Sequence, residues 1–286
     1  MLELSRLTWQ EIQDKLPDLD VLLLPVGSIE QHGPHLPIDN DIYIARALAK
    51  KIAEEAKQSM NISIGIGASM PVGYSQHHME FPGTVSFRKE TYKMVLKDII
   101  HSYYHHGITD ILLINGHGGN GEIIKETLTE IKENSNGPNN SPNNVSNKVP
   151  NKLPNNVPSN EKTNLLDIFN YWNAIKEQGG HLLETQFFCH ACEGETSFAE
   201  ALDQRVLRDE LIDALSQNPE LSKYNLFSEP CGNLPSIEQV SASGVIGNNK
   251  PASRETGEKL LQIVIAKALK KLEVVQSPKV MENMKN

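Results

Sequence analysis

Three short apolar runs alternate with amphipathic helical segments in the first half of this chain. Each run is rich in aliphatic residues and is closed by or followed by glycine or alanine, which is typical of a buried strand in a parallel sheet. The expected strands are 20–27, 62–68 and 110–115, and the expected helices are 40–57, 88–106 and 122–133. This alternation of strand and helix predicts an α/β protein with a mainly parallel, layered sheet.

The rest of the chain continues the pattern with two interruptions. Further strands are expected at 165–171 and 185–189, and a closing amphipathic helix at 253–272. The segment 71–84 contains two prolines and two glycines and is expected to be a long functional loop. The segment 134–163 consists mainly of Asn, Pro, Ser and Lys and is expected to be a disordered surface insertion. We therefore expect a single domain over 1–286 with one insertion.

Composition narrows the class of partner. The formal net charge is -9 and no long basic run is present, so a nucleic-acid partner is not expected. No apolar stretch approaches the roughly 20 residues that cross a bilayer, and the acidic start is unlike a signal peptide. The three cysteines, an odd number, agree with a reducing compartment. We therefore expect a cytoplasmic protein that acts on small solutes and has no membrane partner.

The sequence that follows the first expected strand is dense in metal-binding side chains. Residues 26–41 read V-G-S-I-E-Q-H-G-P-H-L-P-I-D-N-D and contain Glu30, His32, His35, Asp39 and Asp41. Open parallel sheets bind ligands at the carboxyl ends of their strands. In an extended segment Glu30 and His32 point the same way and can reach one ion, while Asp41 approaches from the next helix. Mixed carboxylate and imidazole ligands suit zinc, manganese or iron. A solvated polar loop is the alternative.

The turn after the strand 110–115 has two interpretations. Gly116, Gly118 and Gly121 satisfy G-x-G-x-x-G between a strand and a helix, as a dinucleotide-binding turn requires. A nucleotide-binding, dehydrogenase-like module is therefore an alternative, although the acidic residue expected about 20 positions later falls in the insertion. We favour His117 as a metal ligand whose glycine neighbours let a substrate approach closely. Glycines that only tighten the connection are a further alternative.

A third cluster, C-H-A-C-E-G-E-T-S at 189–197, follows the expected strand 185–189. It contains His190, Glu193 and Glu195, and Thr196 or Ser197 is expected to cap the next helix. A metal-dependent hydrolase still needs a group that protonates the leaving nitrogen, and His190 can do so. Cys189 and Cys192 form a lone C-x-x-C without a second pair, so we expect neither a zinc site nor a redox role.

Two further groups of histidines lie elsewhere: His77 and His78, in the long loop with Tyr74 and Glu80, and His101, His105 and His106, on one expected helix. The loop pair either contacts the substrate or the ion or is simply solvated. The helical group has a spacing that can bind a metal. It has no acidic residue or strand end beside it, so we expect surface or packing roles there.

Taken together, these clusters resemble the creatininase family of metal-dependent amidohydrolases from about residue 21 to 272, the insertion excepted. The motifs are G-S-x-E-Q-H-G-P-H, an aspartate eleven residues after Glu30, N-G-H-G-G-N, H-A-x-x-x-E-T-S and a late A-S-R-E-x-G-E. The resemblance implies a three-layer α/β/α fold, one or two divalent ions (zinc, manganese or iron) and often a homohexamer. It implies as metal ligands Glu30, His32, Asp41, His117 and Glu195. Asp41 would bridge two ions, Glu195 would be a ligand or base, and His190 would be catalytic.

The chain departs from the creatinine-cleaving members beside the turn histidine. Those members have Tyr and Glu there, whereas this chain has Gly118 and Gly119, so the remaining ligand is expected to be Glu195. They also enclose the substrate ring between two tryptophans, of which Trp172 alone has an obvious match here. The resemblance implies hydrolysis of a cyclic amide or formamide, as in creatinine amidohydrolase, but these departures argue against creatinine itself. Relatives with the glycine version of the turn include formamidopyrimidine deformylases of a flavin-precursor pathway and peptide-trimming enzymes. The expected substrate contacts are Gly118 and Gly119, with N–H groups for an oxyanion, and Trp172, His78 and Tyr74.

Overall fold

The computed structural model describes residues 2–136, 163–226 and 235–283. Its centre is a five-stranded sheet in which every strand pairing is parallel. The strands are β1 (Leu2–Glu3), β2 (Val21–Val26), β3 (Ile64–Ile66), β4 (Ile111–Asn115) and β5 (Leu166–Asn170), in the order β1-β3-β2-β4-β5. The predicted parallel sheet is therefore confirmed, with β2 in its middle.

The α-helices of the described chain largely follow the predicted alternation. They are α1 (Trp9–Lys15), α2 (Asn40–Ser59), α3 (Lys89–His105), α4 (Gly121–Asn136), α5 (Tyr171–Ala174), α6 (Glu193–Ala201), α7 (Ala214–Gln217), α8 (Ile237–Val240) and α9 (Arg254–Asn283). Gly107 follows α3 with a φ of 81°, as expected of a helix-ending glycine. The helix α9 continues beyond its predicted end at Leu272. None of the described helices combines the length and apolar character that a membrane span requires.

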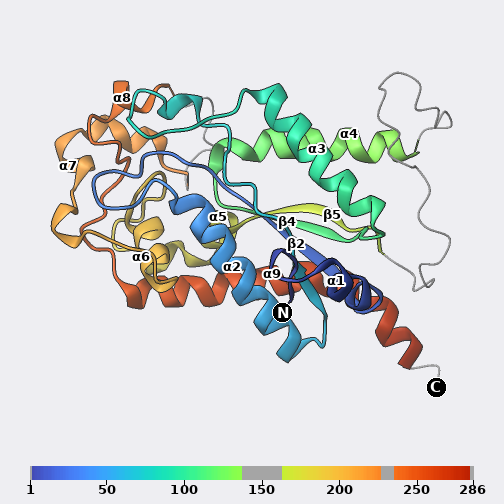
Figure 1. Cartoon of the computed structure of the whole chain (residues 1–286). Helices are drawn as coiled ribbons and strands as arrows, with labels where there is room; N and C mark the ends of the chain where they lie inside the picture. The colour runs from blue at the N-terminus through green and yellow to red at the C-terminus, as the bar shows by residue number, and fades with distance from the viewer. Residues whose placement is uncertain (1, 137–162, 227–234, 284–286) are drawn as a thin grey trace.

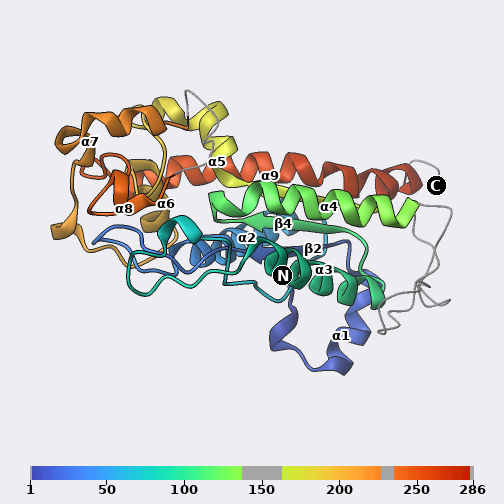
Figure 2. The ribbon, with the colours of Figure 1, turned by 90° about the horizontal axis from the view of Figure 1, so that it is seen from above.

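Helices cover both faces of the sheet. Figure 1 shows α3 and α4 on one face and α2 and α9 on the other, and Figure 2 gives the same molecule from above. Successive strand residues point to opposite faces. Leu23 of β2 accordingly packs in the core with α2 and α9, whereas Leu22 and Leu24 pack in the core with α3 and α4. The expected three-layer α/β/α architecture is confirmed.

The segment 185–189 is not the strand that its sequence predicts. It is irregular, and Gln186 has a positive φ of 50°, which breaks an extended run. Its backbone bonds to side chains instead. Thr185 N–H donates to Glu193 Oε2 at 2.9 Å, and Phe188 N–H donates to Asn225 Oδ1 at 3.2 Å. These side-chain acceptors take the place of a neighbouring strand.

The helix after this segment begins earlier than predicted. Helix α6 starts at Glu193 with Cys192 as its N-cap residue, so Thr196 and Ser197 lie inside the helix and do not cap it. A Cβ atom on Gly257 of α9 would lie 1.8 Å from Ser197 O. The late A-S-R-E-x-G-E motif therefore lets α9 cross α6 at backbone contact, which fixes the helix that supplies Glu195.

The predicted insertion 134–163 is described only at its two ends. Residues 134–136 complete α4, which ends at Asn136. At the other end, the Thr163 hydroxyl and the Leu165 N–H both donate to Asp110 Oδ1. The intervening residues 137–162 lie outside the described part of the chain. A single domain with a disordered insertion therefore stays a prediction.

Candidate metal centre

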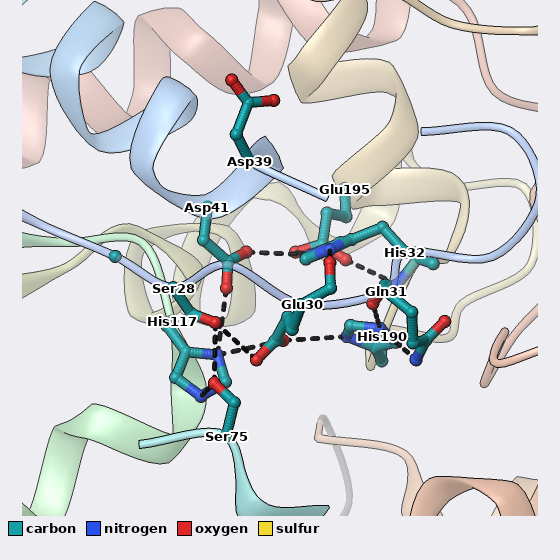
Figure 3. A network of polar contacts seen from close by, with 12 residues as sticks. Ser28, Glu30, Gln31, His32, Asp39, Asp41, Ser75, His117, His190 and Glu195 are labelled. Carbon is teal, nitrogen blue, oxygen red and sulfur yellow. Dashed lines mark hydrogen bonds and ion pairs between the residues drawn. The ribbon is translucent and has the colours of Figure 1, made fainter. Parts of the chain in front are cut away.

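Five side chains predicted as metal ligands converge at the carboxyl edge of the sheet (Figure 3). They are Glu30 and His32 after β2, Asp41 in the first turn of α2, His117 after β4, and Glu195 in the first turn of α6. All five are nearly inaccessible to solvent, with relative exposures from 0% to 6%. Three carboxylates buried in one place require compensating cations or protons.

The described residues contain three candidate donor groups: Glu30 with His32 and His190, and two groups of predicted ligands that share Asp41. In the first of the two groups that share Asp41, His117 Nδ1 lies 3.1 Å from Glu30 Oε1 and 3.0 Å from Asp41 Oδ2. In the second, His32 Nε2 lies 2.9 Å from Asp41 Oδ1 and 3.9 Å from Glu195 Oε1. The donor atoms of each group lie within 4.8 Å of one another. Because the two oxygens of Asp41 face different histidines, this carboxylate is placed to bridge two ions.

The hydrogen bonds of both histidines decide which nitrogen faces the carboxylates. His32 Nδ1 lies 3.1 Å from Glu30 O, and His117 Nε2 lies 2.9 Å from Tyr74 O. A carbonyl oxygen can only accept, so each of these nitrogens carries a hydrogen. In the neutral rings, His32 Nε2 and His117 Nδ1 are therefore unprotonated and face the carboxylates. Backbone carbonyls orient metal-binding histidines in this way.

Protons take the place of cations when no metal ion is bound. Burial disfavours the charged form of His32, yet Asp41 and then Glu195 raise its pKa to about 10. Burial likewise opposes the charge of His117, but Glu30 and Asp41 raise its pKa well above the usual value. Burial raises the pKa of Glu195 to about 7. The cluster therefore holds more negative charge than the protein around it stabilises, and it attracts cations.

Two buried atoms indicate where these cations belong. Within the described part of the chain, His32 Nε2 and Asp41 Oδ2 are buried, and their polar contacts are the ion pairs inside the cluster, to Asp41 Oδ1 and to His117 Nδ1. Both lie inside the two donor groups, and the donor set of three carboxylates and two imidazoles suits zinc, manganese or iron. The residues present therefore fit a centre of two divalent ions.

Residues that the sequence analysis missed orient the ligand carboxylates. Ser28 Oγ donates to Glu30 Oε2 at 2.7 Å, and Ser75 Oγ lies 2.7 Å from Ser28 Oγ. Ala191 N–H donates to Glu195 Oε2 at 2.5 Å. In both carboxylates the other oxygen, Oε1, is left facing the histidines. The i, i+2 relation of Ser28 to Glu30 is a signal that the sequence carries. Ser75 comes from a distant loop and has no such signal.

His190 lies at the edge of the cluster. Its Nδ1 is 3.9 Å from Glu30 Oε1, and its Nε2 lies 2.8 Å from the Gln31 carbonyl oxygen, to which it donates. Burial lowers the pKa of His190 to about 3, so the ring is neutral and Nδ1 is unprotonated. The residue predicted to move a proton thus presents a proton-accepting nitrogen toward the ligands.

The long loop 71–84 contributes two side chains and one backbone carbonyl to the surroundings of the proposed ligands. His78 is 1% exposed and its Nε2 lies 3.3 Å from Glu30 Oε1, so it supports a ligand and is not solvated. Tyr74 contributes its backbone carbonyl, which orients His117. His77 is half-buried and stacks on His117 with ring centroids 5.8 Å apart.

Other predicted residues lie outside the cluster. Asp39 points away from it in Figure 3. His35 is buried and its Nε2 lies 2.8 Å from Thr196 Oγ1, so it joins two parts of the fold. Trp172, a predicted substrate contact, is partly buried in the core and lies edge-on to the ring of Tyr171.

Glu193 holds the preceding loop, although it lies two residues from Glu195. Its carboxylate accepts the N–H groups of Glu184 and Thr185 at 2.8 and 2.9 Å and the Thr185 hydroxyl at 2.7 Å. Replacing Glu193 by alanine leaves these donors without their acceptor, so urea unfolding should show a loss of about 1–3 kcal/mol. Metal content should match the wild type because Glu195 is unchanged. A variant that lost its metal with no change in stability would contradict this assignment.

The glycine-rich turn 116–121 lets the backbone pack closely against two of the proposed ligands. A Cβ atom on Gly116 would lie 2.1 Å from Asp41 O, and one on Gly119 would lie 2.5 Å from His117 Nε2. A Cβ atom on Gly121, the last glycine of G-x-G-x-x-G, would meet nothing within 4 Å. The glycines of this turn that have no room for a side chain are therefore those that pack against Asp41 and His117. This packing favours the metal-ligand interpretation over a dinucleotide-binding turn.

Comparison with known proteins agrees with this geometry. The family model described as "Creatininase: Creatinine amidohydrolase" matches residues 5–272. Creatinine amidohydrolase of Pseudomonas putida is 34% identical over 125 residues, which are 43% of this chain and 47% of that protein. Mycofactocin precursor peptide peptidase of Mycolicibacterium smegmatis is 38% identical over 104 residues, 36% of this chain and 42% of that protein. The matched segments therefore span less than half the length of these curated relatives.

A solved structure covers nearly the whole chain. A mutant creatininase of Zn-Zn type superposes with a TM-score of 0.66 and 25% sequence identity over 94% of this chain and 96% of that one. Two of the three candidate donor groups in this chain share Asp41, an arrangement compatible with a Zn-Zn form. A family match over residues 5–272, the shared fold and the converging ligands lead to one conclusion: this chain belongs to the creatininase family.

Proposed function

We propose that this chain is a metal-dependent amidohydrolase that cleaves a non-peptide C–N bond in a cyclic amide or formamide. The observation that carries the proposal is the Asp41 carboxylate, which lies between Glu30 with His117 and His32 with Glu195. Divalent ions bound there would polarise a substrate carbonyl and lower the pKa of a water molecule. Membership of the creatininase family supports the same reaction class.

In this proposal His190 carries the proton. Its Nδ1 faces the ligands unprotonated, so it accepts a proton from the attacking water and passes it to the departing nitrogen. Glu195, held by Ala191 N–H, keeps its other oxygen toward His32. The backbone N–H groups of Gly118 and Gly119 are the proposed donors to the oxyanion.

Replacing His190 by alanine should lower kcat by about 10²- to 10⁴-fold, the usual contribution of a positioned acid–base group. All five proposed ligands remain, so elemental analysis should find the wild-type metal content. His101→Ala on α3 is the matched control because His101 lies on a helix away from the cluster, and its kcat should be unchanged. An unchanged kcat in the His190 variant would refute the proton-carrying role.

Gly119 bears on the choice of substrate. The creatinine-cleaving members that this chain resembles carry a glutamate at the matching position. Here a Cβ atom on Gly119 would lie 2.5 Å from His117 Nε2 and 2.6 Å from Tyr74 O. A side chain would therefore break the bond that orients His117, and Glu195 takes the ligand role instead. We accordingly propose a substrate other than creatinine, with formamidopyrimidine deformylation as the specific alternative.

The proposal extends to the setting in which the protein works. The net charge of -9 disfavours nucleic acid and leaves a small amide as the partner. Resemblance to the creatininase family suggests a homohexamer in the cytoplasm. Light scattering on protein eluting from a size-exclusion column should give the mass of six chains. The mass of one chain would contradict the proposed hexamer but would leave the proposed metal site unaffected.

Turnover by metal-reloaded protein tests the proposed function. The protein is stripped with a chelator, reloaded with zinc or manganese, and assayed on creatinine, formamidopyrimidines, lactams and short peptides. We expect hydrolysis of a cyclic amide or formamide that is lost on chelation and restored by metal. Cleavage of peptides alone would overturn the non-peptide assignment. Metal-independent NAD binding with no hydrolysis would favour the nucleotide-binding alternative.

A further inference from the structure

Gln31 lies between two metal ligands but serves neither ion directly. The residue is 6% exposed, and its Oε1 accepts the Gly33 N–H at 2.9 Å. Figure 3 shows its side chain beside His190. That bond fixes the orientation of the amide, because an amide nitrogen cannot accept a hydrogen bond. The NH₂ group is therefore directed at His78 Nδ1 at 2.9 Å, His190 Nε2 at 3.0 Å and Gly244 O at 3.2 Å.

An amide NH₂ has two hydrogens, so only two of these three atoms can receive one. His190 Nε2 also lies 2.8 Å from the Gln31 carbonyl oxygen, which can only accept. His190 Nε2 must then carry its own hydrogen and cannot receive another. The two amide hydrogens therefore go to Gly244 O and His78 Nδ1. His78 in turn carries its hydrogen on Nε2, the nitrogen 3.3 Å from Glu30 Oε1.

The loop that faces Gln31 is shaped around this amide. Gly244 has a φ of 79°, and a Cβ atom there would lie 1.8 Å from Gln31 Oε1. The same loop returns to His190, whose carbonyl oxygen accepts the Ile246 N–H at 2.9 Å. A glycine at 244 thus leaves room for a glutamine that reaches across to a segment 213 residues away.

We propose that Gln31 is a positioning residue that sets the tautomers of two histidines at the metal centre. Its side-chain amide makes His78 a hydrogen-bond donor toward Glu30. Its backbone carbonyl makes His190 a donor at Nε2 and so leaves Nδ1 free toward the ligands. Any effect of Gln31 on the rate of hydrolysis rests on the proposed amidohydrolase function. The assignment of the histidine tautomers does not depend on that function.

The direct test is a ¹⁵N-histidine NMR spectrum of zinc-loaded protein, which distinguishes protonated from unprotonated ring nitrogens. The His78 signals are assigned by comparison with His78→Gln. In the wild type we expect His78 to be protonated at Nε2 alone. In Gln31→Leu, which has a similar size but no donor, we expect this pattern to be lost while zinc content is retained. An unchanged His78 pattern in Gln31→Leu would overturn the proposal.

Two further variants separate positioning from loss of structure. Gln31→Glu keeps the volume but supplies an acceptor, so His78 should carry its hydrogen on Nδ1. Gly244→Ala displaces the amide without deleting it and should reproduce the Gln31→Leu spectrum. Gln13→Leu, on the exposed surface of α1, is the control and should match the wild type. A Gln31→Glu spectrum identical to the wild type would also refute the assignment.

Turnover supplies a second readout. Gln31→Leu should lower kcat about 10- to 100-fold, as loss of other outer-shell partners of metal ligands does, with KM little changed. A rise in KM with unchanged kcat would contradict a positioning role. If wild-type protein hydrolyses no amide, the proposed function fails, yet the tautomer spectra still decide whether Gln31 orients His78.

Discussion

Asp41→Asn should empty both metal subsites and lower hydrolysis at least about 10³-fold. Each oxygen of Asp41 faces a different ligand histidine, His32 Nε2 at 2.9 Å and His117 Nδ1 at 3.0 Å. An amide has one oxygen and a nitrogen that cannot bind a cation, so the bridge between the two groups is lost. Metal catalysis contributes several kcal/mol, and each 1.36 kcal/mol is a factor of ten in rate.

Elemental analysis and kcat, measured on the same preparation, test this expectation. Asp39→Asn is the matched control, because this neighbouring aspartate points away from the cluster and accepts from Gln204 Nε2. The control should keep its metal and its activity. Full metal content and near-normal kcat in Asp41→Asn would show that Asp41 is no ligand.

Gly116→Ala should disable the same centre without changing any ligand. A Cβ atom at this position would lie 2.1 Å from Asp41 O and 2.9 Å from Asp41 C, which are backbone atoms of the first turn of α2. The turn after β4 or the start of α2 must shift, and Asp41 then leaves its place between the histidines. Overpacking of this kind costs about 1–3 kcal/mol of stability. We expect that loss together with a loss of bound metal.

Gly121→Ala is the control for this variant. A Cβ atom there would meet nothing within 4 Å, and the residue begins α4, so the change should be neutral or stabilising by up to about 1 kcal/mol. Thermal unfolding of both variants, with and without zinc, measures the difference. A Gly116→Ala protein that binds two ions and unfolds like the wild type would contradict the packing argument.

The sheet and the convergence of Glu30, His32 and His117 at its edge could be predicted because they depend on local patterns. Every residue of β2 and β4 is buried, and all of them except Asn115 at the end of β4 are apolar, so both strands stand out in the sequence. Glu30 and His32 follow β2 with the i, i+2 spacing of one face, and His117 follows β4. Because parallel neighbours bring their carboxyl ends to one edge, the amino-acid pattern is sufficient to predict that these three residues lie together.

The roles of the residues in the cluster 189–197 were harder to predict, because the sequence pattern places the start of helix α6 too late. With the strand expected to run to Cys189 and the cap expected at Thr196, the local pattern does not separate the roles of Glu193 and Glu195, and only the resemblance to the creatininase family selects Glu195. In the structure α6 begins at Glu193, and residues two apart on a helix face nearly opposite sides. Glu195 therefore faces the ligands, whereas Glu193 faces the loop that it holds.

Contacts between distant segments had no signal in one sequence. Ser75 reaches Ser28 across 47 residues, and Gln31 reaches Gly244 across 213. The sequence leaves His78 with three possible roles, a contact to the substrate, a contact to the ion or a solvated position, and only the fold shows that it turns inward to Glu30. Such pairings depend on how loops pack over the sheet edge, which local periodicity does not encode.

The most direct test of the two-ion centre is the anomalous diffraction of zinc-loaded crystals. We expect two zinc peaks, one among Glu30, Asp41 and His117 and one among His32, Asp41 and Glu195, with Asp41 between them. A single peak away from Asp41, or no peak at this edge of the sheet, would contradict it.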